Sequence, residues 1–191
     1  MAWDTEKTKR LLLDAAKAEF AEFGIAGARV NRIAEKAGVN KERIYGHFGS
    51  KEELFNVILA EAMAELAEVV RPGEGEVGEY VGRIFDYHQD NPTLLRLLMF
   101  EALYYGDRLA ADNDERTERY SCASQSLAAS TGYTSTQAAQ LLLTLIGLGA
   151  WPIAMPQLSR LALQAPSADD ETRTGLREFL VDFAERATAP R

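Results

Sequence analysis

Apolar residues recur at the spacing of an α-helix along almost the whole chain, and this periodicity restricts the fold more than any other feature. Over residues 4–23, for example, Leu12, Ala16, Phe20 and Phe23 fall on one face of a predicted helix. The alternation of apolar and polar residues that is typical of β-strands is missing from the sequence. The sequence therefore predicts an all-α protein.

Glycine, proline and capping residues predict where these helices begin and end. Gly24 follows the first helix, where a left-handed C-cap is expected. Asn40 is expected to cap the third helix, Ser50 the fourth in a capping box, and Ser167 the last. The predicted helices span about residues 4–23, 30–37, 41–47, 51–70, 77–90, 92–105, 114–130 and 135–150, then a kink from Pro152 to Pro156, a short helix to about 163, and a last helix over 168–187.

The charges are distributed unevenly, although the formal net charge of the 191 residues is -8. Residues 1–51 contain 10 Lys or Arg and 7 Asp or Glu, a net charge of +3, and they include every lysine of the chain. Residues 52–191 contain 11 Lys or Arg and 22 Asp or Glu, a net charge of -11. A basic end on an acidic body indicates a protein that binds nucleic acid with that end.

A single cysteine, Cys122, excludes an intramolecular disulfide and a cysteine-cluster metal site. We expect it to be a buried structural thiol rather than a redox sensor. The N-terminus lacks the apolar core of a signal peptide, and the most apolar run, residues 141–155, is too short for a bilayer span and contains Pro152. We therefore expect a cytoplasmic protein that does not interact with a membrane.

Three helices within the first 48 residues, with a tight turn between the second and the third, predict a helix-turn-helix. Ala34 is small where two helices approach, and Gly38 can adopt the positive φ of the turn. Ile44 is expected to pack the third helix onto the first two. That helix then exposes polar side chains of the kind that enter the major groove of DNA.

The segment KRLLLDAAKAEFAEFGIAGARVNRIAEKAGVNKERIYGHFGSKEELF, residues 9–55, resembles the DNA-binding head of TetR-type (TetR/AcrR-like) transcriptional repressors. The shared pieces are AA...F...G in the first helix, V..IA..AGV in the second helix and its turn, and IY.HF.SKEEL at the end. The resemblance implies a helix-turn-helix DNA-binding domain over residues 1–50 and a helical ligand-binding and dimerisation domain over residues 51–191. It implies a homodimeric repressor that binds double-stranded operator DNA and is released by a small-molecule ligand.

The resemblance places DNA contacts at the start of the second helix, on the third helix and just after it. Tyr45 and Lys51 match positions that hold the phosphate backbone, and Arg43 can bind a guanine edge. His47 matches a position near phosphate, and packing against the fourth helix is its alternative. The expected DNA-binding residues are Arg29, Asn31, Lys41, Glu42, Arg43, Tyr45, Gly46, His47 and Lys51.

Three residues depart from the family pattern. Ala28 stands where the second helix usually begins with Ser or Thr, so it provides no side-chain cap. Gly46 replaces a residue that is commonly large or polar, so one groove contact is missing or moved. Glu42 either accepts a hydrogen bond from a cytosine amino group or interacts favourably with the N-terminus of its own helix, which is the simpler interpretation.

One recognition helix buries too little surface for tight, specific binding, so we expect two heads related by a twofold axis. By the resemblance, the helices over 135–150 and 168–187 pair with those of a second subunit, and the other body helices enclose a ligand. For each candidate residue, packing in the protomer's own core is the alternative. The dimer candidates are Leu141, Leu142, Leu145, Leu148, Leu176, Phe179, Leu180 and Phe183, and the pocket candidates are Phe85, His88, Met99, Phe100, Leu103, Tyr104, Tyr120, Trp151 and Met155.

An enzyme is not expected, because two histidines and one cysteine lie far apart in the sequence and no glycine-rich phosphate loop accompanies them. His88 and Asp90, two residues apart on a helix, point to different sides, so we expect no metal and no cofactor. The alternatives are a helical adaptor or an enzyme whose head resembles a helix-turn-helix by chance, and a DNA-binding activator without ligand control.

Overall fold

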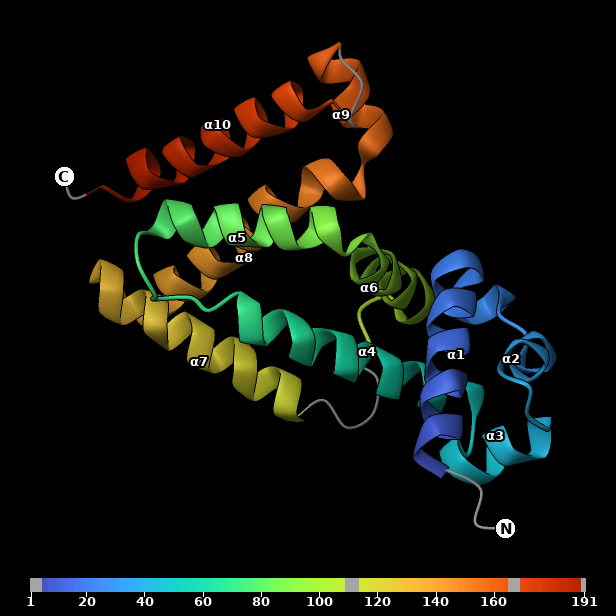
Figure 1. Ribbon diagram of the computed structural model, residues 1–191. Helices are drawn as coiled ribbons and strands as arrows, with labels where there is room; N and C mark the ends of the chain where they lie inside the picture. The colour runs from blue at the N-terminus through green and yellow to red at the C-terminus, as the bar shows by residue number, and fades with distance from the viewer. Residues whose placement is uncertain (1–4, 109–113, 165–168, 190–191) are drawn as a thin grey trace. The chain divides into compact units, whose positions relative to one another are not determined.

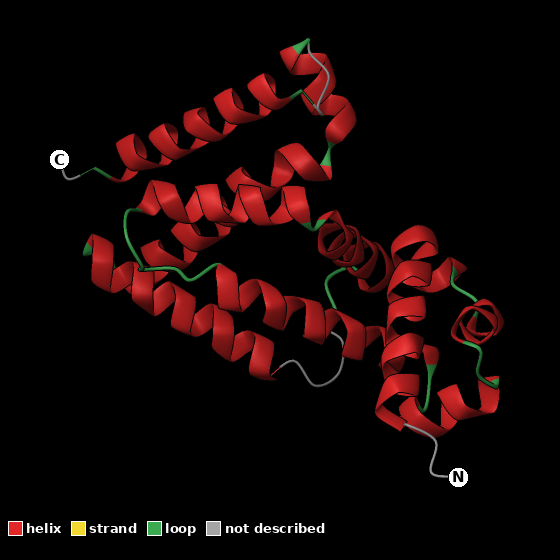
Figure 2. Cartoon of the chain, in the orientation of Figure 1, coloured by secondary structure: helices red, strands yellow, loops and turns green. Residues whose placement is uncertain are grey.

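The computed structural model describes residues 5–108, 114–164 and 169–189, and this part of the chain forms ten helices (Figure 1). The described residues contain no β-strand (Figure 2), so the predicted all-α class is confirmed. The helices are α1 (Thr5–Gly27), α2 (Val30–Ala37), α3 (Lys41–Phe48), α4 (Lys51–Val69), α5 (Val77–Asp90), α6 (Pro92–Tyr105), α7 (Asp114–Thr131), α8 (Ser135–Ala154), α9 (Pro156–Leu163) and α10 (Asp170–Thr188).

The helices belong to two compact units. Among the described residues, the first unit consists of 5–64 and 93–108, and the second of 65–92, 114–164 and 169–189. The first unit thus contains α1–α3, most of α4 and nearly all of α6. The second contains α5 and α7–α10. The helix-turn-helix that was expected over residues 1–50 lies within the first unit.

The apolar face of α1 forms the centre of the first unit. Leu12, Ala16 and Phe20 are buried, and the Phe20 ring meets the Phe55 ring of α4 edge to face, with 5.2 Å between the centroids. Phe23 differs from the expectation, because its side chain is 39% exposed and is covered by the guanidinium of an arginine on α2. A cation over the ring stabilises an aromatic side chain that remains in contact with water.

The helical path of α1 is broken at Gly24, but Gly24 is not the expected left-handed C-cap, because the helix resumes after it and ends at Gly27 instead of near residue 23. Gly24 has φ 66° and ψ 179°, a conformation that L-residues with a side chain rarely adopt. A Cβ atom at this position would also lie 2.6 Å from the ring of Phe100 on α6. Both the backbone conformation and the neighbouring ring therefore require glycine here.

In the second unit, α5 packs against both α8 and α10, and α7 packs against α8 (Figure 1). Gly149 of α8 permits a close approach, because a Cβ atom there would lie 2.8 Å from Ile84 of α5. Arg177 of α10 donates through Nε to both carboxylate oxygens of Asp86, at 2.9 and 2.8 Å, and through Nη2 to Glu79 at 3.3 Å. Close packing on one helix and an ion-pair cluster on the other thus hold α5 in place.

Besides the end of α1, two helix boundaries in the second unit differ from the expectation. α8 continues through Pro152 to Ala154 instead of ending near residue 150. It ends at Met155, which has φ -120° and ψ 65°, because the following Pro156 disfavours the helical conformation of the residue before it. α10 is capped by Asp169, whose carboxylate accepts the N–H of Thr172 at 2.9 Å. The expected cap, Ser167, lies outside the described residues.

In the second unit, the single cysteine and the apolar helix α8 also differ from the expectation. Cys122 is exposed on α7, so the prediction of a buried thiol was wrong. Because α8 extends past Pro152, it has the length and composition of a membrane span, with a mean hydropathy of 1.3. Core helices of soluble proteins can have the same length and composition, so one such helix is a weak indication of a membrane.

Candidate nucleic-acid interface

α3 is positioned by its N-terminal cap, by the turn before it and by one buried residue. The Asn40 side chain accepts the N–H of Glu42 at 3.1 Å, which confirms the expected cap. Gly38 has φ 64° and closes the turn after α2. Ile44 is 1% exposed and anchors the helix to the core of the first unit. The remaining polar face of α3 is consequently turned outward.

All six expected DNA-binding residues of α3 lie on its exposed surface. Tyr45 is 48% exposed. At Gly46 the surface is open, because no atom lies within 4 Å of the place that a Cβ atom would take. The ring of His47 has Phe48 of its own helix as a neighbour, with 6.2 Å between the centroids. The six residues are Lys41, Glu42, Arg43, Tyr45, Gly46 and His47.

The other three expected residues lie at or beside the start of α2. Arg29 is the N-cap residue, in an extended conformation, and both Arg29 and Asn31 are exposed. The Lys51 ammonium lies 3.5 Å from the carbonyl oxygen of Ala28, immediately before the cap. The first-turn N–H groups of a helix have no intrahelical acceptor, and they attract phosphate. This end of α2, together with Lys51, therefore has the charge and the donors that a DNA backbone requires.

A buried carboxylate on α1 belongs to the same region and was not predicted from the sequence. Glu19 has no exposed surface, and its Oε1 accepts the backbone N–H of Arg29 at 2.9 Å. Arg32 donates to the same oxygen through Nε at 2.7 Å, with Nη2 2.6 Å away, and Lys36 Nζ lies 3.6 Å from Oε2.

Burial raises the pKa of the Glu19 carboxyl, but the hydrogen bonds from Arg32 and Arg29 and the charges of Arg32 and Lys36 outweigh it. The pKa of Glu19 therefore lies below its usual value, and the group is a carboxylate at neutral pH. Arg32 also donates to the Gly27 carbonyl at 3.1 Å, and its guanidinium lies 4.1 Å from the Phe23 ring centroid. Arg32 thus connects α1, the segment before α2, and α2 itself.

The sequence did contain a signal for this cluster. Glu19 lies three residues after Ala16 and four before Phe23, on the apolar face of the first helix. A charged residue in an apolar stripe indicates a buried partner, because an unpaired buried charge is costly. A second signal was that neither Ala28 nor Arg29, which is the observed N-cap, has a side chain that can cap α2, so the start of α2 needs an acceptor from elsewhere.

The expected ligand-pocket residues are divided between the two units. Four lie on α6 in the first unit, namely Met99, Phe100, Leu103 and Tyr104, and five lie in the second, namely Phe85, His88, Tyr120, Trp151 and Met155. Phe85 lines a cavity of about 110 Å³, and Tyr120 lines an open groove of about 620 Å³ between α7 and α8. The other seven residues line neither of these two spaces.

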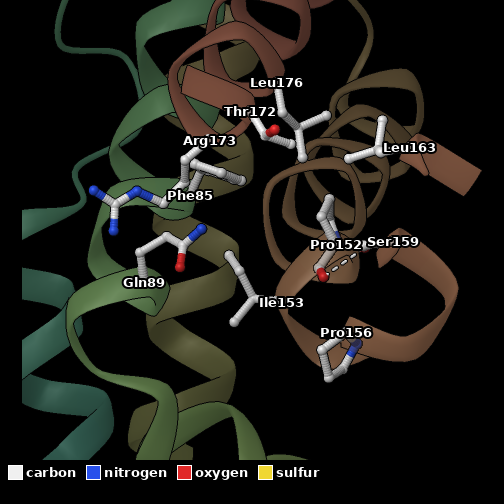
Figure 3. A pocket seen from close by; sticks show the side chains of 10 residues that line it. All are labelled: Phe85, Gln89, Pro152, Ile153, Pro156, Ser159, Leu163, Thr172, Arg173 and Leu176. Atoms are coloured by element: carbon white, nitrogen blue, oxygen red, sulfur yellow. Dashed lines mark hydrogen bonds between the residues drawn. The ribbon is translucent and has the colours of Figure 1, made fainter. Parts of the chain in front are cut away.

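The smaller cavity is formed by α5, α8, α9 and α10, and its walls are largely apolar (Figure 3). The Gln89 amide faces the apolar side chains of α8, whereas the Arg173 guanidinium points away from them (Figure 3). Arg173 is already paired with Asp170 at 2.7 Å, so the cavity has no uncompensated charge from this residue. The lining residues are Phe85, Gln89, Pro152, Ile153, Pro156, Ser159, Leu163, Thr172, Arg173 and Leu176.

His88 is a buried polar residue of the second unit. It is 3% exposed, and its Nδ1 has no hydrogen-bond partner among the described residues. Burial lowers the pKa of its imidazole to about 4, so the ring is neutral at pH 7. The ring packs against Tyr87, with 5.7 Å between the centroids.

The dimer candidates on α8 and α10 fall into three groups. Leu142, Leu145 and Leu180 are buried within their own unit, so they contribute to the core of the protomer. Phe179 and Phe183 are 60% and 50% exposed, and their rings stack on each other. Half-buried positions are taken by Leu141, Leu148 and Leu176. Leu143 of α8, 74% exposed, was not predicted but belongs with the exposed group.

Two family profiles together match most of the chain. The profile described as "Bacterial regulatory proteins, tetR family" matches residues 12–58. A second profile, "Tetracyclin repressor-like, C-terminal domain", matches residues 76–186. The first match contains α2 and α3 completely, and the second contains α5–α9 and most of α10.

Individual relatives agree with these profiles. The HTH-type transcriptional repressor SCO4008 of Streptomyces coelicolor is 36% identical over 191 residues, which cover 97% of each chain. The HTH-type transcriptional repressor NicS of Pseudomonas putida is 32% identical over 55% of this chain and 53% of its own. The crystal structure of SCO4942 of Streptomyces coelicolor matches with a TM-score of 0.75 at 28% identity, covering 94% of this chain and 97% of the other.

These matches extend over the helix-turn-helix and the helical body alike, and they agree with the exposed polar face of α3 and the positive start of α2. The resemblance of residues 9–55 is thereby confirmed and extended to almost the whole chain. The chain belongs to the TetR family of DNA-binding transcriptional regulators.

Proposed function

We propose that the chain acts as a homodimeric repressor that holds operator DNA with two copies of α3 and is released by a small-molecule ligand. The observation that carries this proposal is the fixed geometry of α3, whose Asn40 cap and buried Ile44 leave one polar face exposed beside the positive start of α2. Two relatives that are named transcriptional repressors support repression rather than activation.

The contacts divide into base recognition and phosphate binding. Lys41 and Arg43 lie in the first turn of α3, the part of a recognition helix that reaches base edges. Arg43 can donate two hydrogen bonds to a guanine. Lys51, Arg29 and the first-turn N–H groups of α2 hold phosphate, which fixes the register on the duplex without reading its sequence.

Dimerisation is proposed to cover the exposed apolar stripes of α8 and α10. Leu143, Gly147 and Trp151 follow one another at intervals of four residues on α8, and Phe179 and Phe183 do so on α10. Leu143 is 74% exposed and Trp151 54%, so both stripes lack a partner within the described residues of one protomer. A second copy supplies the complementary surface, because a twofold interface uses the same patch on both subunits.

The ligand is proposed to be small and largely uncharged. The cavity of Figure 3 has a volume of about 110 Å³, apolar walls and an amide from Gln89. A largely apolar pocket with few polar groups is typical of small-molecule sites. Since Arg173 is paired with Asp170, a neutral molecule with one hydrogen-bonding group suits this cavity better than an anion.

Selection of bound duplexes from a random DNA library tests the proposal directly. We expect the selected sites to be palindromic, with half-sites whose centres lie about 10 base pairs apart or a multiple of that spacing. Sedimentation at micromolar concentration should show a dimer, both free and on the selected DNA. Recovery of no enriched sequence, or a monomer on a single half-site, contradicts the proposal.

A further inference from the structure

We propose that Glu19 is a positioning residue for DNA binding, because its buried carboxylate caps α2 from a different helix and fixes the end of α2 that meets the phosphate backbone. The inference rests on the proposed contact between the start of α2 and DNA. It concerns a residue that has no exposed surface and therefore cannot touch DNA itself.

The chemistry of the cap follows from the residues around it. In an ordinary capping box, the third residue of the helix is Glu or Gln, and its side chain accepts the N–H of the cap residue. Here the cap residue is Arg29, which makes no side-chain cap, and the third helical residue is Arg32, which has no acceptor. Glu19 of α1 supplies the missing acceptor and receives the Arg29 N–H at 2.9 Å.

Arg32 makes this arrangement specific to one geometry. Its Nε and Nη2 lie 2.7 and 2.6 Å from the same Glu19 oxygen, while Nη2 also donates to the Gly27 carbonyl and the guanidinium covers Phe23. Short, charge-assisted hydrogen bonds constrain orientation more than neutral ones do. The N-terminus of α2 is thus attached to α1 rather than only to its own first turn.

The groups that we assign to phosphate lie on this end of α2 or, in the case of Lys51 of α4, beside it. Arg29 is exposed at the cap, Asn31 is exposed in the first turn, and Lys51 lies at 3.5 Å from the carbonyl of Ala28. A shift of this helix end displaces Arg29, Asn31 and the first-turn N–H groups together, and it moves the Ala28 carbonyl relative to Lys51 of α4. Loss of the Glu19 cap should therefore weaken phosphate contacts, while base recognition by α3, which has its own Asn40 cap, is retained.

Charge alone predicts the opposite effect, and this difference makes the inference testable. Removing an acid from the basic head increases its positive charge, which by itself tightens binding to DNA. Glu22 serves as the matched control, because it is an exposed acid on the same helix. Glu22→Leu should leave the affinity unchanged or increase it, whereas Glu19→Leu should decrease it about fivefold, the factor that corresponds to the free energy by which a lost cap destabilises a helix end.

The experiment measures dissociation constants of the wild type, Glu19→Leu, Glu19→Gln and Glu22→Leu for a selected site and for a random duplex at several salt concentrations. For Glu19→Leu we expect equal losses on both duplexes and a salt dependence that is shallower by about one phosphate contact. Glu19→Gln retains an acceptor oxygen but loses the charge that strengthens the hydrogen bonds from Arg32, so its affinity should fall by a smaller factor of about two on both duplexes. Partial unfolding would also lower the apparent affinity, but it would leave the salt slope unchanged. Melting temperatures and salt slopes together therefore distinguish partial unfolding from the loss of a phosphate contact.

Three results overturn the inference: unchanged or tighter DNA binding by folded Glu19→Leu, a loss confined to the specific site, or an unchanged salt slope. If Glu19→Leu does not fold, Glu19→Gln decides, because a folded Gln variant with wild-type affinity and slope also overturns it. Failure of the wild type to bind any DNA contradicts the proposed function instead.

Discussion

Gly24 and Gly46 both lie within helical segments of the first unit, yet their surroundings impose opposite requirements. Gly24 has φ 66° and faces the ring of Phe100, which a Cβ atom would approach to 2.6 Å. Gly46 lies inside α3, and no atom is within 4 Å of its potential Cβ position. The same substitution is therefore expected to change stability in opposite directions.

Gly24→Ala should lower the free energy of unfolding by about 3 kcal/mol, from backbone strain and overpacking against the Phe100 ring. Gly46→Ala should raise it by about 1 kcal/mol, because alanine restricts the unfolded chain and fits an exposed helical site. Urea denaturation of the two variants beside the wild type checks both values. A change of the same sign for both variants contradicts the backbone geometry described here.

His88 gives the second unit a pH-dependent stability. Its pKa is about 4 in the folded chain because of burial, whereas an exposed imidazole has a pKa near 6.5. Between these values the unfolded chain binds a proton that the folded chain does not, so stability falls as the pH falls from about 6.5 towards 4. From pH 8 to pH 5 the wild type should lose about 2 kcal/mol more than His88→Gln. Parallel pH profiles of the two proteins contradict a buried, neutral His88.

Single side chains were predicted less well than the helices that carry them. Phe23 and Cys122 lie in predicted helices but are more exposed than expected, and the burial of Glu19 was not predicted. The position of a side chain on a helix follows from periodicity, whereas its burial depends on partners distant in the sequence. Arg32, for example, both neutralises Glu19 and covers Phe23.

At the scale of elements, capping and turn residues predicted α2 at its observed limits and α3 to within one residue, because these signals are local. Asn40 and Gly38 each perform the expected task at a helix end, whereas Gly24 interrupts α1 without ending it. The predicted end of α8 was wrong because Pro152 is tolerated inside the helix. The helix ends instead before Pro156, which disfavours the helical conformation of Met155. The cap of α2 was missed because its acceptor is on another helix.

Removal of a cationic side chain should have different effects on DNA binding at Arg43 of α3 and at Lys51, the first residue of α4. Arg43→Ala removes a side chain of α3 and should reduce affinity for the selected site by about 1–3 kcal/mol while relaxing the base preference. Lys51→Ala should weaken binding to specific and random duplexes by similar factors and reduce the salt slope by about one. Anisotropy titrations on both duplexes check this division. Equal effects of the two variants on base preference contradict it.

At the scale of the whole molecule, the acidic body is expected to disfavour non-specific binding to DNA. Residues 1–51 carry +3 and residues 52–191 carry -11, so we expect the body to repel phosphate and the head to make the proposed contacts. The acidic net charge of -8 is therefore compatible with DNA binding. The fold class and the location of the head followed from the sequence, because both depend on local patterns.

The ligand site was not predictable in the same way. Its expected residues lie on helices of two different units, and only Phe85 and Tyr120 line the two spaces found in the second unit. Helical periodicity identifies which residues are apolar and inward, but not which of them leave a space unfilled. Cavities depend on how helices pack, and the pattern within one helix carries no information about that.

If dimerisation occurs through α8 and α10, a charge placed on the exposed apolar stripe of α10 should dissociate the dimer. Phe179→Glu should convert the dimer to a monomer at micromolar concentration, because it places an acid in an apolar twofold interface. Thr174→Glu is the control, since Thr174 is exposed and lies nine residues before Phe183, on the opposite side of the helix. Sedimentation velocity compares the two variants. A dimer that survives Phe179→Glu contradicts the proposed surface.

The most direct test of the central claim is an anisotropy titration of the full chain on the DNA immediately upstream of its own gene, beside an unrelated duplex of equal length. We predict saturable binding with two chains per site, at least a thousandfold tighter than to the unrelated duplex and strongly weakened by salt. Binding that does not distinguish the two duplexes, or that is unaffected by salt, contradicts the account of this chain as an operator-binding dimer.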